Sequence, residues 1–364
     1  MHTDHLRSIA LADEAPDRPR AASALGVRAD ATPAMADAYV DAHPFGRSYH
    51  KHAWMRVVSE AFGHQSKYLV AERGNVTVGV LPVVGFNSRL FGRFMVSMPF
   101  LNYGGVLADD VEAERALLAH AIELTRHSGG RHLELRHDRQ HFSELAAKRH
   151  KVAMELRLAA TAEDQWRVLD RKLRNQVRKA EKSGLQIHDG STELLDRFYD
   201  VFARNMRDLG TPVYAKEFFR RVLVTFPEQT RVVVVSLNEQ PIAASILHWY
   251  RQRIEVPWAS SLREFNSLCA NVLLYWHMLR FAIERGFEVF DFGRSTPGEG
   301  TYQFKKQWGA EPRELVWEYW TAEGGSVPEL NPHKPKFALA IRAWQRLPVP
   351  VANALGPHIV RNIP

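Results

Sequence analysis

The sequence predicts an α/β (α+β) protein built from two similar halves, each with a mixed, mostly antiparallel sheet flanked by helices. Its 364 residues suffice for two domains of ordinary size. Hydrophobic residues make up 45% of the chain and charged residues 24%, which are proportions typical of a globular protein. Helix-like and strand-like patterns follow the same order twice along the chain, which indicates duplication of one α/β unit.

The first half, 25–160, follows a segment of different composition. Residues 1–24 are rich in Ala, Asp, Arg and Pro without periodicity, so we expect a flexible tail there. The half itself begins with apolar residues at helical spacing and continues with strand-like runs. In order, we expect helices at 35–40 and 51–62, strands at 68–71, 76–84 and 94–98, a helix at 111–127, and strands at 132–135 and 152–158. The last of these strands is expected to close the first half.

The second half, 161–323, repeats this order of elements. In order, we expect a helical stretch at 162–183, a strand at 185–188, helices at 193–209 and 216–225, strands at 231–237, 241–250 and 253–259, a helix at 267–285, a strand at 289–292, a helix at 302–308 and a strand at 314–320. Individual residues do not repeat between the halves, so the duplication is inferred from the pattern alone.

The remaining segment, 324–364, begins with a stretch rich in Pro and Gly that is typical of a linker. It continues into a predicted amphipathic helix at 336–346. The apolar stripe of this helix consists of Phe337, Ala340, Ile341 and Trp344. We expect the helix to pack on the body of the protein, with a contact to a membrane surface as the alternative.

Charge and cysteine content limit the classes of function. Cys269 is the only cysteine, so neither an internal disulfide nor a cysteine-rich zinc site is expected. The first residues lack the pattern of a signal peptide, and no run of about 18 apolar residues occurs. We therefore expect a cytoplasmic protein, at most peripheral at the inner membrane face. The net charge of +7 indicates an anionic partner. No metal, no tightly bound cofactor and no DNA partner is predicted.

A basic segment at 171–184 contains six basic residues and one acidic residue. As a helix, it places Arg174 and Arg178 on one face and Leu173 and Val177 on another. The planar guanidinium group of arginine binds phosphates well, so the basic face is a candidate anion site. The alternative is a solvated basic face without a binding role.

A second segment, 291–309, runs from a predicted strand through a loop rich in Gly to a short helix. Loops of this kind often carry sites because N–H groups at the start of a helix are free to bind ligands. We expect Asp291 and Arg294 to pair or to hold a polar ligand. Lys305 and Lys306 are adjacent, so on a helix they point in different directions and only one of them faces a site. The alternative is a structural turn with surface lysines.

Three segments resemble the Fem family, which transfers amino acids from aminoacyl-tRNA to peptidoglycan precursors, and its Fem-like relatives. They are KLRNQVRKA at 172–180, LGTPVY at 209–214, and DFGR at 291–294 together with GTYQFK at 300–305. The linker and tail, 330–364, are similar to the subgroup associated with exosortase/PEP-CTERM exopolysaccharide systems. The resemblance spans about 25–364 and implies two tandem domains with the fold of GNAT acetyltransferases.

The resemblance also implies a reaction in which an amine attacks an activated acyl carbonyl. The acceptor would be an amine-bearing precursor of the cell envelope or of an exopolysaccharide. Lys305 matches the lysine that stabilises the oxyanion in Fem transferases. Independently of the resemblance, Glu255 and His248 lie in predicted strands, and we expect either to face the site and act as general base. The alternative is that each forms a structural hydrogen bond within the sheet. The expected catalytic residues are Lys305, Asp291 and Glu255, and the expected substrate-binding residues are Arg174, Arg178, Tyr214, His248, Arg294, Tyr302, Gln303 and Lys306.

The identity of the donor stays open. The segment at 263–271 contains no glycine, unlike the loop that holds coenzyme A in GNAT enzymes, and no helical arm for tRNA is evident. The leading hypothesis is a Fem-like acyl or aminoacyl transferase with acyl-CoA or aminoacyl-tRNA as donor co-substrate. One alternative is an acyl-CoA-dependent N-acyltransferase acting on an amino sugar or a lipid precursor. The other is a non-catalytic module that binds RNA or an anionic membrane through the basic face.

Overall fold

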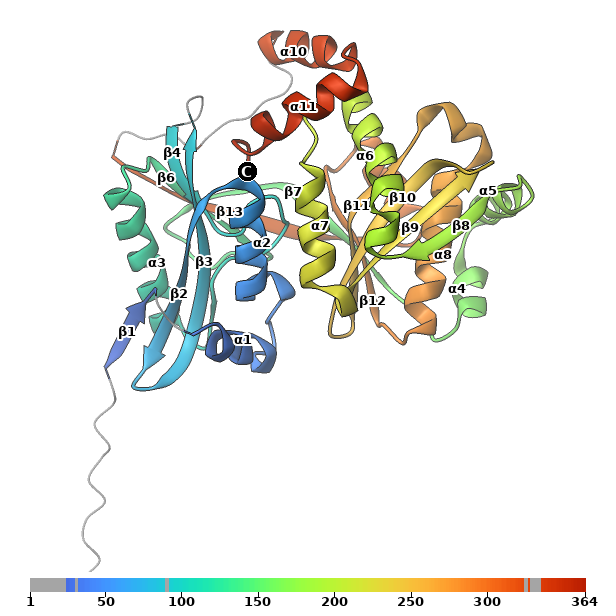
Figure 1. The fold of residues 1–364 in the computed structure, drawn as a ribbon. Coiled ribbons are helices and arrows are strands. Elements are labelled where there is room, and N and C mark those ends of the chain that lie inside the picture. The colour runs from blue at the N-terminus through green and yellow to red at the C-terminus, as the bar shows by residue number, and fades with distance from the viewer. Residues whose placement is uncertain (1–23, 30–31, 89–91, 324–326, 328–334) are drawn as a thin grey trace, which may run out of the picture.

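Both halves share one continuous 13-stranded sheet in the computed structural model (Figure 1). The structure describes residues 24–29, 32–88, 92–323, 327 and 335–364. The tail expected at 1–24 lies outside the described residues except for residue 24, and so does most of the expected linker. Among the described residues, no helix combines the length and the apolar character needed to cross a membrane.

The helices and strands follow the expected order, with short 3₁₀ turns between them. The first half contains β1 (Leu25–Arg28), α1 (Pro33–Ala42), α2 (His52–Phe62), β2 (Gln65–Arg73), β3 (Val76–Ser88), β4 (Gly92–Val96), β5 (Leu107–Ala108), α3 (Val111–His127), β6 (His132–His137) and β7 (Ala146–Arg157). The second half contains α4 (Ala162–Val168), α5 (Arg171–Glu181), β8 (Gln186–Gly190), α6 (Leu195–Leu209), α7 (Lys216–Thr225), β9 (Thr230–Leu237), β10 (Gln240–Tyr250), β11 (Arg253–Ser261), α8 (Ala270–Glu284), β12 (Val289–Ser295), α9 (Gly300–Lys306) and β13 (Glu311–Thr321). Two further helices follow, α10 (Pro335–Gln345) and α11 (Val349–Val360).

The predicted duplication is present in the topology. The series β1, α1, α2, β2, β3, β4, α3, β6 corresponds element by element to β8, α6, α7, β9, β10, β11, α8, β12. In each series a helix connects two parallel neighbours, because α3 leads from β4 to β6 and α8 leads from β11 to β12. The other neighbours within each series pair antiparallel. The sheet is therefore mixed and mostly antiparallel, as expected.

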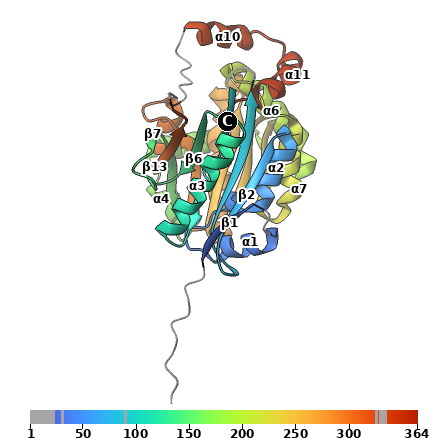
Figure 2. The ribbon, with the colours of Figure 1, turned by 90° about the vertical axis from the view of Figure 1, so that its left-hand side faces the viewer.

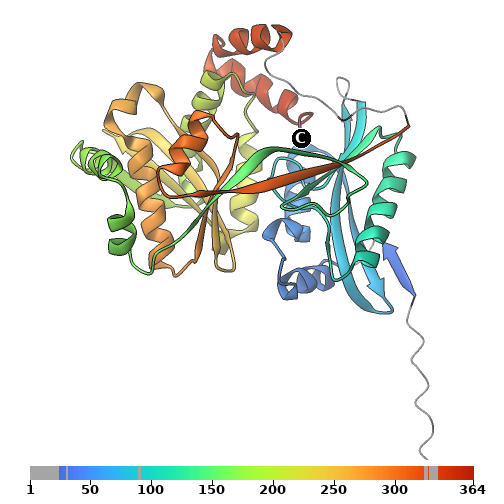
Figure 3. The same cartoon turned by 180° about the vertical axis from the view of Figure 1, so that it is seen from behind.

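The last strand of each half lies in the middle of the sheet rather than at the end of its own half. Strand β13 pairs with β6 of the first half and with β7, and β7 pairs in turn with β12 of the second half (Figure 3). The expectation that the strand near 152–158 closes the first half is therefore wrong. The alternation of residues along a strand indicates which face is buried, but it carries no information about the neighbouring strand.

Three apolar cores cover the two faces of the sheet. One lies under α3 of the first half, and a second lies under α5 and α8 of the second half. The third core is shared, since α1 and α2 of the first half and α6 and α7 of the second half cover the same face. Helices α2 and α7 pack against each other at the centre of the molecule, and Figure 2 shows α1 and α2 on the face of the sheet opposite α3. The shared core makes the halves one packing unit.

The C-terminal helices differ in part from the expectation. Helix α10 matches the predicted helix and contacts α6, where its Ile341 fills the space beside Gly210. Phe337, counted in the expected stripe, has a side chain outside the described residues. Helix α11 was not predicted because Pro350, Gly356 and Pro357 are typical of a loop. A proline in the first turn of a helix is tolerated, which explains Pro350.

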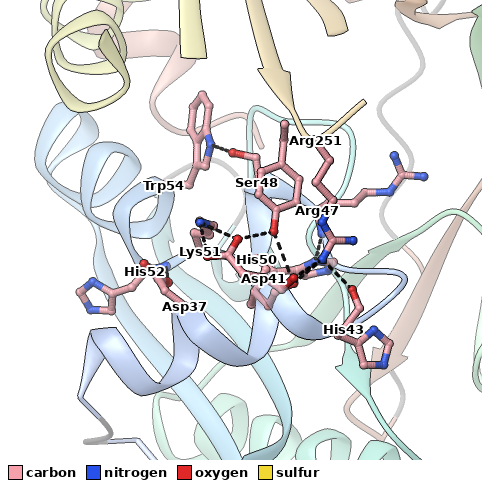
Figure 4. A network of polar contacts seen from close by, with 12 residues as sticks. Asp37, Asp41, His43, Arg47, Ser48, His50, Lys51, His52, Trp54 and Arg251 are labelled. Atoms are coloured by element: carbon pink, nitrogen blue, oxygen red, sulfur yellow. Dashed lines mark hydrogen bonds and ion pairs between the residues drawn. The ribbon is translucent and has the colours of Figure 1, made fainter. Parts of the chain in front are cut away.

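A second link between the halves is a cation at the end of a helix. Arg251, in the turn between β10 and β11, donates from Nη2 to the carbonyl oxygens of Val40 (3.2 Å), Asp41 (2.6 Å) and His43 (2.9 Å) at the end of α1 (Figure 4). Tyr250 also donates to the Asp41 carboxylate at 2.6 Å. The last carbonyl groups of a helix lack partners within the helix and attract cations, so Arg251 stabilises the contact of α1 with the second half.

We expect Arg251→Ala to lower the free energy of unfolding by about 1–2 kcal/mol, because the α1 carbonyl groups lose a charged donor. Denaturant unfolding followed by circular dichroism measures this change. Arg56→Ala is the control, since Arg56 is an exposed arginine within α2 rather than at a helix end. The control should change stability by less than about 0.5 kcal/mol. Equal losses in the two variants would contradict the role of Arg251.

Candidate active site

Two buried carboxylates lie side by side in the sheet of the second half. Glu255 of β11 and Asp291 of β12 are paired across the two parallel strands, and theirs is the last pair in register before β11 and β12 separate. Their exposed fractions are 6% and 0%. Parallel strands place paired residues on the same face, so both side chains point toward the face that carries the shared core.

The first half supplies hydrogen-bond donors to both carboxylates. Tyr49 donates to Glu255 Oε2 at 2.7 Å, and Asn102 donates to Glu255 Oε1 at 3.0 Å. Tyr103 donates to Asp291 Oδ2 at 2.9 Å. These contacts join loops of the first half to strands of the second half. The candidate site is therefore complete only when the two halves are assembled.

Burial and charge repulsion change the ionisation of this pair. Burial and the nearby charge of Asp291 together raise the pKa of Glu255 to about 8, against the opposing effects of the Arg47 charge and of the hydrogen bonds from Tyr49 and Asn102. Glu255 therefore carries a proton at neutral pH. Such a shifted carboxyl group is typical of catalytic acids and bases.

Lys305 of α9 is close enough to the carboxylate pair to interact electrostatically with both Asp291 and Glu255. Its Nζ donates to the main-chain oxygen atoms of Gly293 at 3.0 Å and of Arg294 at 2.9 Å. Burial lowers the pKa of Lys305 to about 8, and the charges of Asp291 and Glu255 partly oppose this shift. An ammonium group has three N–H donors, so one remains available to a ligand. Lys306 is exposed, as expected for the neighbour of a buried lysine.

A bulge at Gly293 determines where Arg294 points. Asp291 pairs with Glu155 of β7 and Arg294 pairs with Ala153, so three steps along β12 match two steps along β7. The additional residue places Asp291 and Arg294 on the same face of the sheet, whereas a regular strand would place them on opposite faces. Gly293 adopts φ = 74°, and a Cβ there would lie 2.9 Å from the main-chain oxygen of Val256. Only glycine fits this position without strain.

A cavity of about 290 Å³ between the halves reaches Glu255 and Tyr49. It is lined by residues 44–49 and 138 of the first half and by residues 248, 250–253, 255, 288 and 289 of the second half. Arg47 lines it too, pairs with Asp138 at 2.7 Å and lies 4.0 Å from the centre of the Tyr103 ring. The cavity gives a small molecule access to Glu255 from the side of the β10–β11 turn.

Several expected site residues lie near Glu255, Asp291 and Lys305. Tyr214 is partly buried, and burial raises its pKa, while the charges of Arg294 and Arg136 lower it. His248 is buried, lines the cavity and bonds to Ser48 at 2.8 Å, and burial lowers its pKa to about 3. Arg294 does not pair with Asp291, because the Asp291 carboxylate accepts from Tyr103 and from the Gly293 N–H instead.

Other expected site residues lie elsewhere. Arg174 and Arg178 are on α5, which packs against α8, and Arg178 lies over the Trp166 ring at 5.5 Å. Neither contacts Glu255, Asp291 or Lys305 in the described structure. Tyr302 packs with the core under α8, and Gln303 is exposed. The basic face of α5 is therefore separate from the carboxylate pair.

Comparisons with known proteins agree with this arrangement. A model of the acetyltransferase (GNAT) domain matches residues 167–306, which is less than half of the chain. The crystal structure of FemX superimposes with a TM-score of 0.64 at 15% identity, over 80% of this chain and 96% of FemX. A tandem GNAT protein from the clavulanic acid biosynthesis pathway gives 0.52 at 13% identity, over 84% and 100% of the two chains. The fold is that of two tandem GNAT domains.

A further solved structure, L-PGS from Bacillus licheniformis, matches with a TM-score of 0.50 at 11% identity, over 82% of this chain and 98% of L-PGS. No curated protein matches the sequence. These likenesses establish the predicted GNAT-type fold, and the match at 167–306 assigns a GNAT domain to the second half.

The two GNAT-type domains differ at equivalent positions. In the first domain, the last pair in register between the parallel strands β4 and β6 is Val96 and Glu134. This pair corresponds to Glu255 and Asp291 of the second domain. Valine thus replaces one carboxylate, and Glu134 is neutralised by Arg136, whose Nε donates to it at 2.8 Å. The carboxylate pair is therefore a property of the second domain.

Sequence reasoning missed the residues that the first half contributes. Tyr49, Asn102 and Tyr103 lie in loops far from Glu255 along the chain, and nothing in their spacing indicates a contact across the halves. The only available signal was the segment NYGG at 102–105, a polar and glycine-rich loop after a predicted strand.

We expect Gly293→Ala to lower the free energy of unfolding by at least about 1 kcal/mol more than Gly286→Ala. Both glycines have φ near 75°, but a Cβ at position 286 meets no atom within 4 Å, whereas at 293 it approaches Val256. The difference between the two variants isolates the close approach of β12 to β11. Chemical denaturation measures it, and equal losses would show that the approach carries no strain.

Proposed function

We propose that this protein is a Fem-like acyltransferase that moves an acyl or aminoacyl group onto an amine of a cell-envelope or exopolysaccharide precursor. The observation that carries the proposal is the carboxylate pair of Glu255 and Asp291 beside the buried Lys305. A proton acceptor and a fixed cation near each other are what acyl transfer to an amine requires. The GNAT-type fold and the likeness to FemX support the proposal.

In the proposed reaction, the acceptor amine attacks the carbonyl carbon of the donor and a C–N bond forms. Ionised Glu255 takes the proton that the amine loses. The carbonyl oxygen becomes an oxyanion, which the remaining N–H of Lys305 stabilises. When the tetrahedral intermediate collapses, the bond to the leaving group breaks and the leaving group takes the proton from Glu255. Asp291 keeps Lys305 positively charged and the pKa of Glu255 high.

The other residues of the site position the reacting groups. Tyr49 and Asn102 hold the two oxygens of Glu255, so the carboxylate faces in one direction. His248 is held by Ser48, and burial lowers its pKa to about 3, so it is a weak base and Glu255 is the general base of this proposal. Tyr214 and Arg294 lie close enough to interact electrostatically and are proposed to bind substrate.

The structure bears on the choice of donor. The segment before α8 forms a 3₁₀ turn, Arg263–Leu268, in which the N–H groups of Phe265 and Cys269 bond to main-chain oxygens. These groups are therefore not free to bind the pyrophosphate of coenzyme A in the way that a glycine-rich loop does. This favours a donor other than acyl-CoA. An acyl-CoA-dependent N-acyltransferase remains the alternative, because a GNAT domain matches this half.

We expect kcat/KM to follow a bell-shaped pH profile with both limbs near pH 8. Glu255 must lose its proton to act as base, so activity falls below its pKa of about 8. Lys305 must keep its proton, so activity falls above its pKa of about 8. Transfer to glucosamine from aminoacyl-tRNA and from acetyl-CoA, assayed between pH 6 and pH 10, measures the profile and identifies the donor class.

Lys305→Met should lower kcat by about 100-fold, as loss of an oxyanion-stabilising group does. The exposed Lys67→Met is the control and should leave kcat unchanged. Full activity of the Lys305 variant, or transfer from neither donor in the wild-type protein, would contradict the proposal.

We also propose that the C-terminal helices contact an anionic membrane surface. Val351, Leu355 and Ile359 of α11 form an exposed stripe at helical spacing, and Leu339 of α10 is 71% exposed. Exposed basic residues, Arg342 and Arg346, lie in the same segment. Apolar residues next to basic ones are typical of helices that lie on membranes containing anionic lipids.

Leu355→Glu should reduce co-sedimentation with phosphatidylglycerol vesicles, because it places a negative charge in the apolar stripe. Binding by the wild-type protein should also weaken as salt is added. Val111→Glu is the control, since Val111 is 64% exposed at the start of α3, where an acidic residue is tolerated. Absence of wild-type binding, or equal binding by the Leu355 variant, would exclude this contact.

A further inference from the structure

A group of cations surrounds one indole ring next to Lys305. The Cζ atoms of Arg136 and Arg294 lie 4.4 Å and 5.6 Å from the centre of the Trp317 ring. Burial lowers the pKa of Lys151 of β7, and the nearby charge of Arg294 lowers it further. We call Arg136, Lys151, Arg294 and Trp317 the Trp317 cluster. Its members come from β6, β7, β12 and β13, which are neighbours in the sheet.

Arg136 is fully buried and yet keeps an unused donor. Its Nε bonds to Glu134 and its Nη1 bonds to the main-chain oxygen of Leu101, both at 2.8 Å. Its Nη2 is buried and has no partner among the described residues, and the same is true of Trp317 Nε1. Buried N–H groups are almost always satisfied because an unpaired one costs about 1–3 kcal/mol. Two such donors on side chains that pack against each other indicate a site for a ligand.

The cluster also has more positive than negative charge. Within the part of the chain that the structure describes, Arg294 forms no ion pair, and Lys151 donates to the neutral Thr296 hydroxyl at 2.5 Å. Glu134 is the carboxylate that bonds to the cluster, through Arg136. Three positive charges therefore face one negative charge, and the exposed Glu299 acts on Lys151 only at a distance. The excess of two charges matches an oxyanion that carries two negative charges.

Arg294 is placed to bind such a ligand and to link it to the reaction. Its side chain is exposed to solvent, while its main-chain oxygen holds the Nζ of Lys305 at 2.9 Å. A guanidinium group offers paired N–H donors that fit phosphate and carboxylate oxygens. The charge of the Arg294 guanidinium also acts on Lys305, so a ligand bound by Arg294 would lie within electrostatic reach of the ammonium group that is proposed to stabilise the oxyanion.

We infer that the Trp317 cluster binds a doubly charged oxyanion of a substrate, either a phosphate group or a dicarboxylate, next to Lys305. For its role in catalysis this inference rests on the proposed function, and it names a chemical group that the substrate carries. Binding itself is independent of turnover, so the two proposals can fail separately.

Isothermal titration calorimetry of the full chain with inorganic pyrophosphate and with malonate tests the inference. We expect at least one of these anions to bind at low salt, and Arg294→Gln to weaken its Kd by roughly tenfold, as loss of a charge-assisted hydrogen bond does. Arg126→Gln is the matched control, because Arg126 is exposed and lies over another indole ring, that of Trp320, at 5.1 Å. The control should bind with unchanged affinity.

Each outcome decides the inference. Tighter binding of pyrophosphate identifies a phosphate group, and tighter binding of malonate identifies a dicarboxylate. No heat from either anion, or equal affinities of the Arg294 and Arg126 variants, overturns it. Retained anion binding by Lys305→Met together with undiminished transfer would leave the anion site standing and contradict the proposed function. Transfer by a wild-type protein that binds neither anion would support the proposed function and contradict the anion site.

Discussion

The position of β13 between β6 and β7 is the constraint on which the rest of the structure depends. Because this strand belongs to the second half and pairs with the first, the two sheets become one and cannot separate without breaking main-chain hydrogen bonds. The exchange also keeps α2 and α7 in contact over a shared core. Loops of the first domain are thereby held against β11 and β12, where they meet Glu255 and Asp291.

Burial gives these polar groups their properties. A carboxylate and a lysine that are removed from water each favour their neutral forms, so the pKa of Glu255 rises and that of Lys305 falls. The pKa values of Glu255 and Lys305 are both near 8, close to the pH range in which an amine acceptor gains and loses its proton. Hydrogen bonds from Tyr49, Asn102 and Tyr103 satisfy the carboxylates and limit the cost of burying them.

Duplication with divergence explains why the site is single. The first domain keeps the pair of parallel strands but has Val96 where the second has Glu255, and its Glu134 is bonded to Arg136. The first domain has instead acquired the donors that complete the site of the second. Arg136 serves both arrangements, since it neutralises Glu134 and extends an unused N–H into the Trp317 cluster. The basic face of α5, a candidate anion site in the sequence, contacts neither the carboxylate pair nor the Trp317 cluster in the described structure.

The fold class, the order of elements and the segment that carries Asp291, Arg294 and Lys305 could be predicted from the sequence. The periodicity of hydrophobic residues depends on local structure, so it predicts helices and strands. A glycine-rich loop between a strand and a short helix is typical of a site with free polar groups. Which strands are neighbours became clear from the tertiary structure, because the alternation of apolar and polar residues along one strand does not depend on the strand with which it pairs. The tertiary structure also decided that a one-residue bulge at Gly293 turns Arg294 to the face of Asp291. The contacts of Tyr49, Asn102 and Tyr103 with the second domain depend on that pairing, and so no local pattern predicts them.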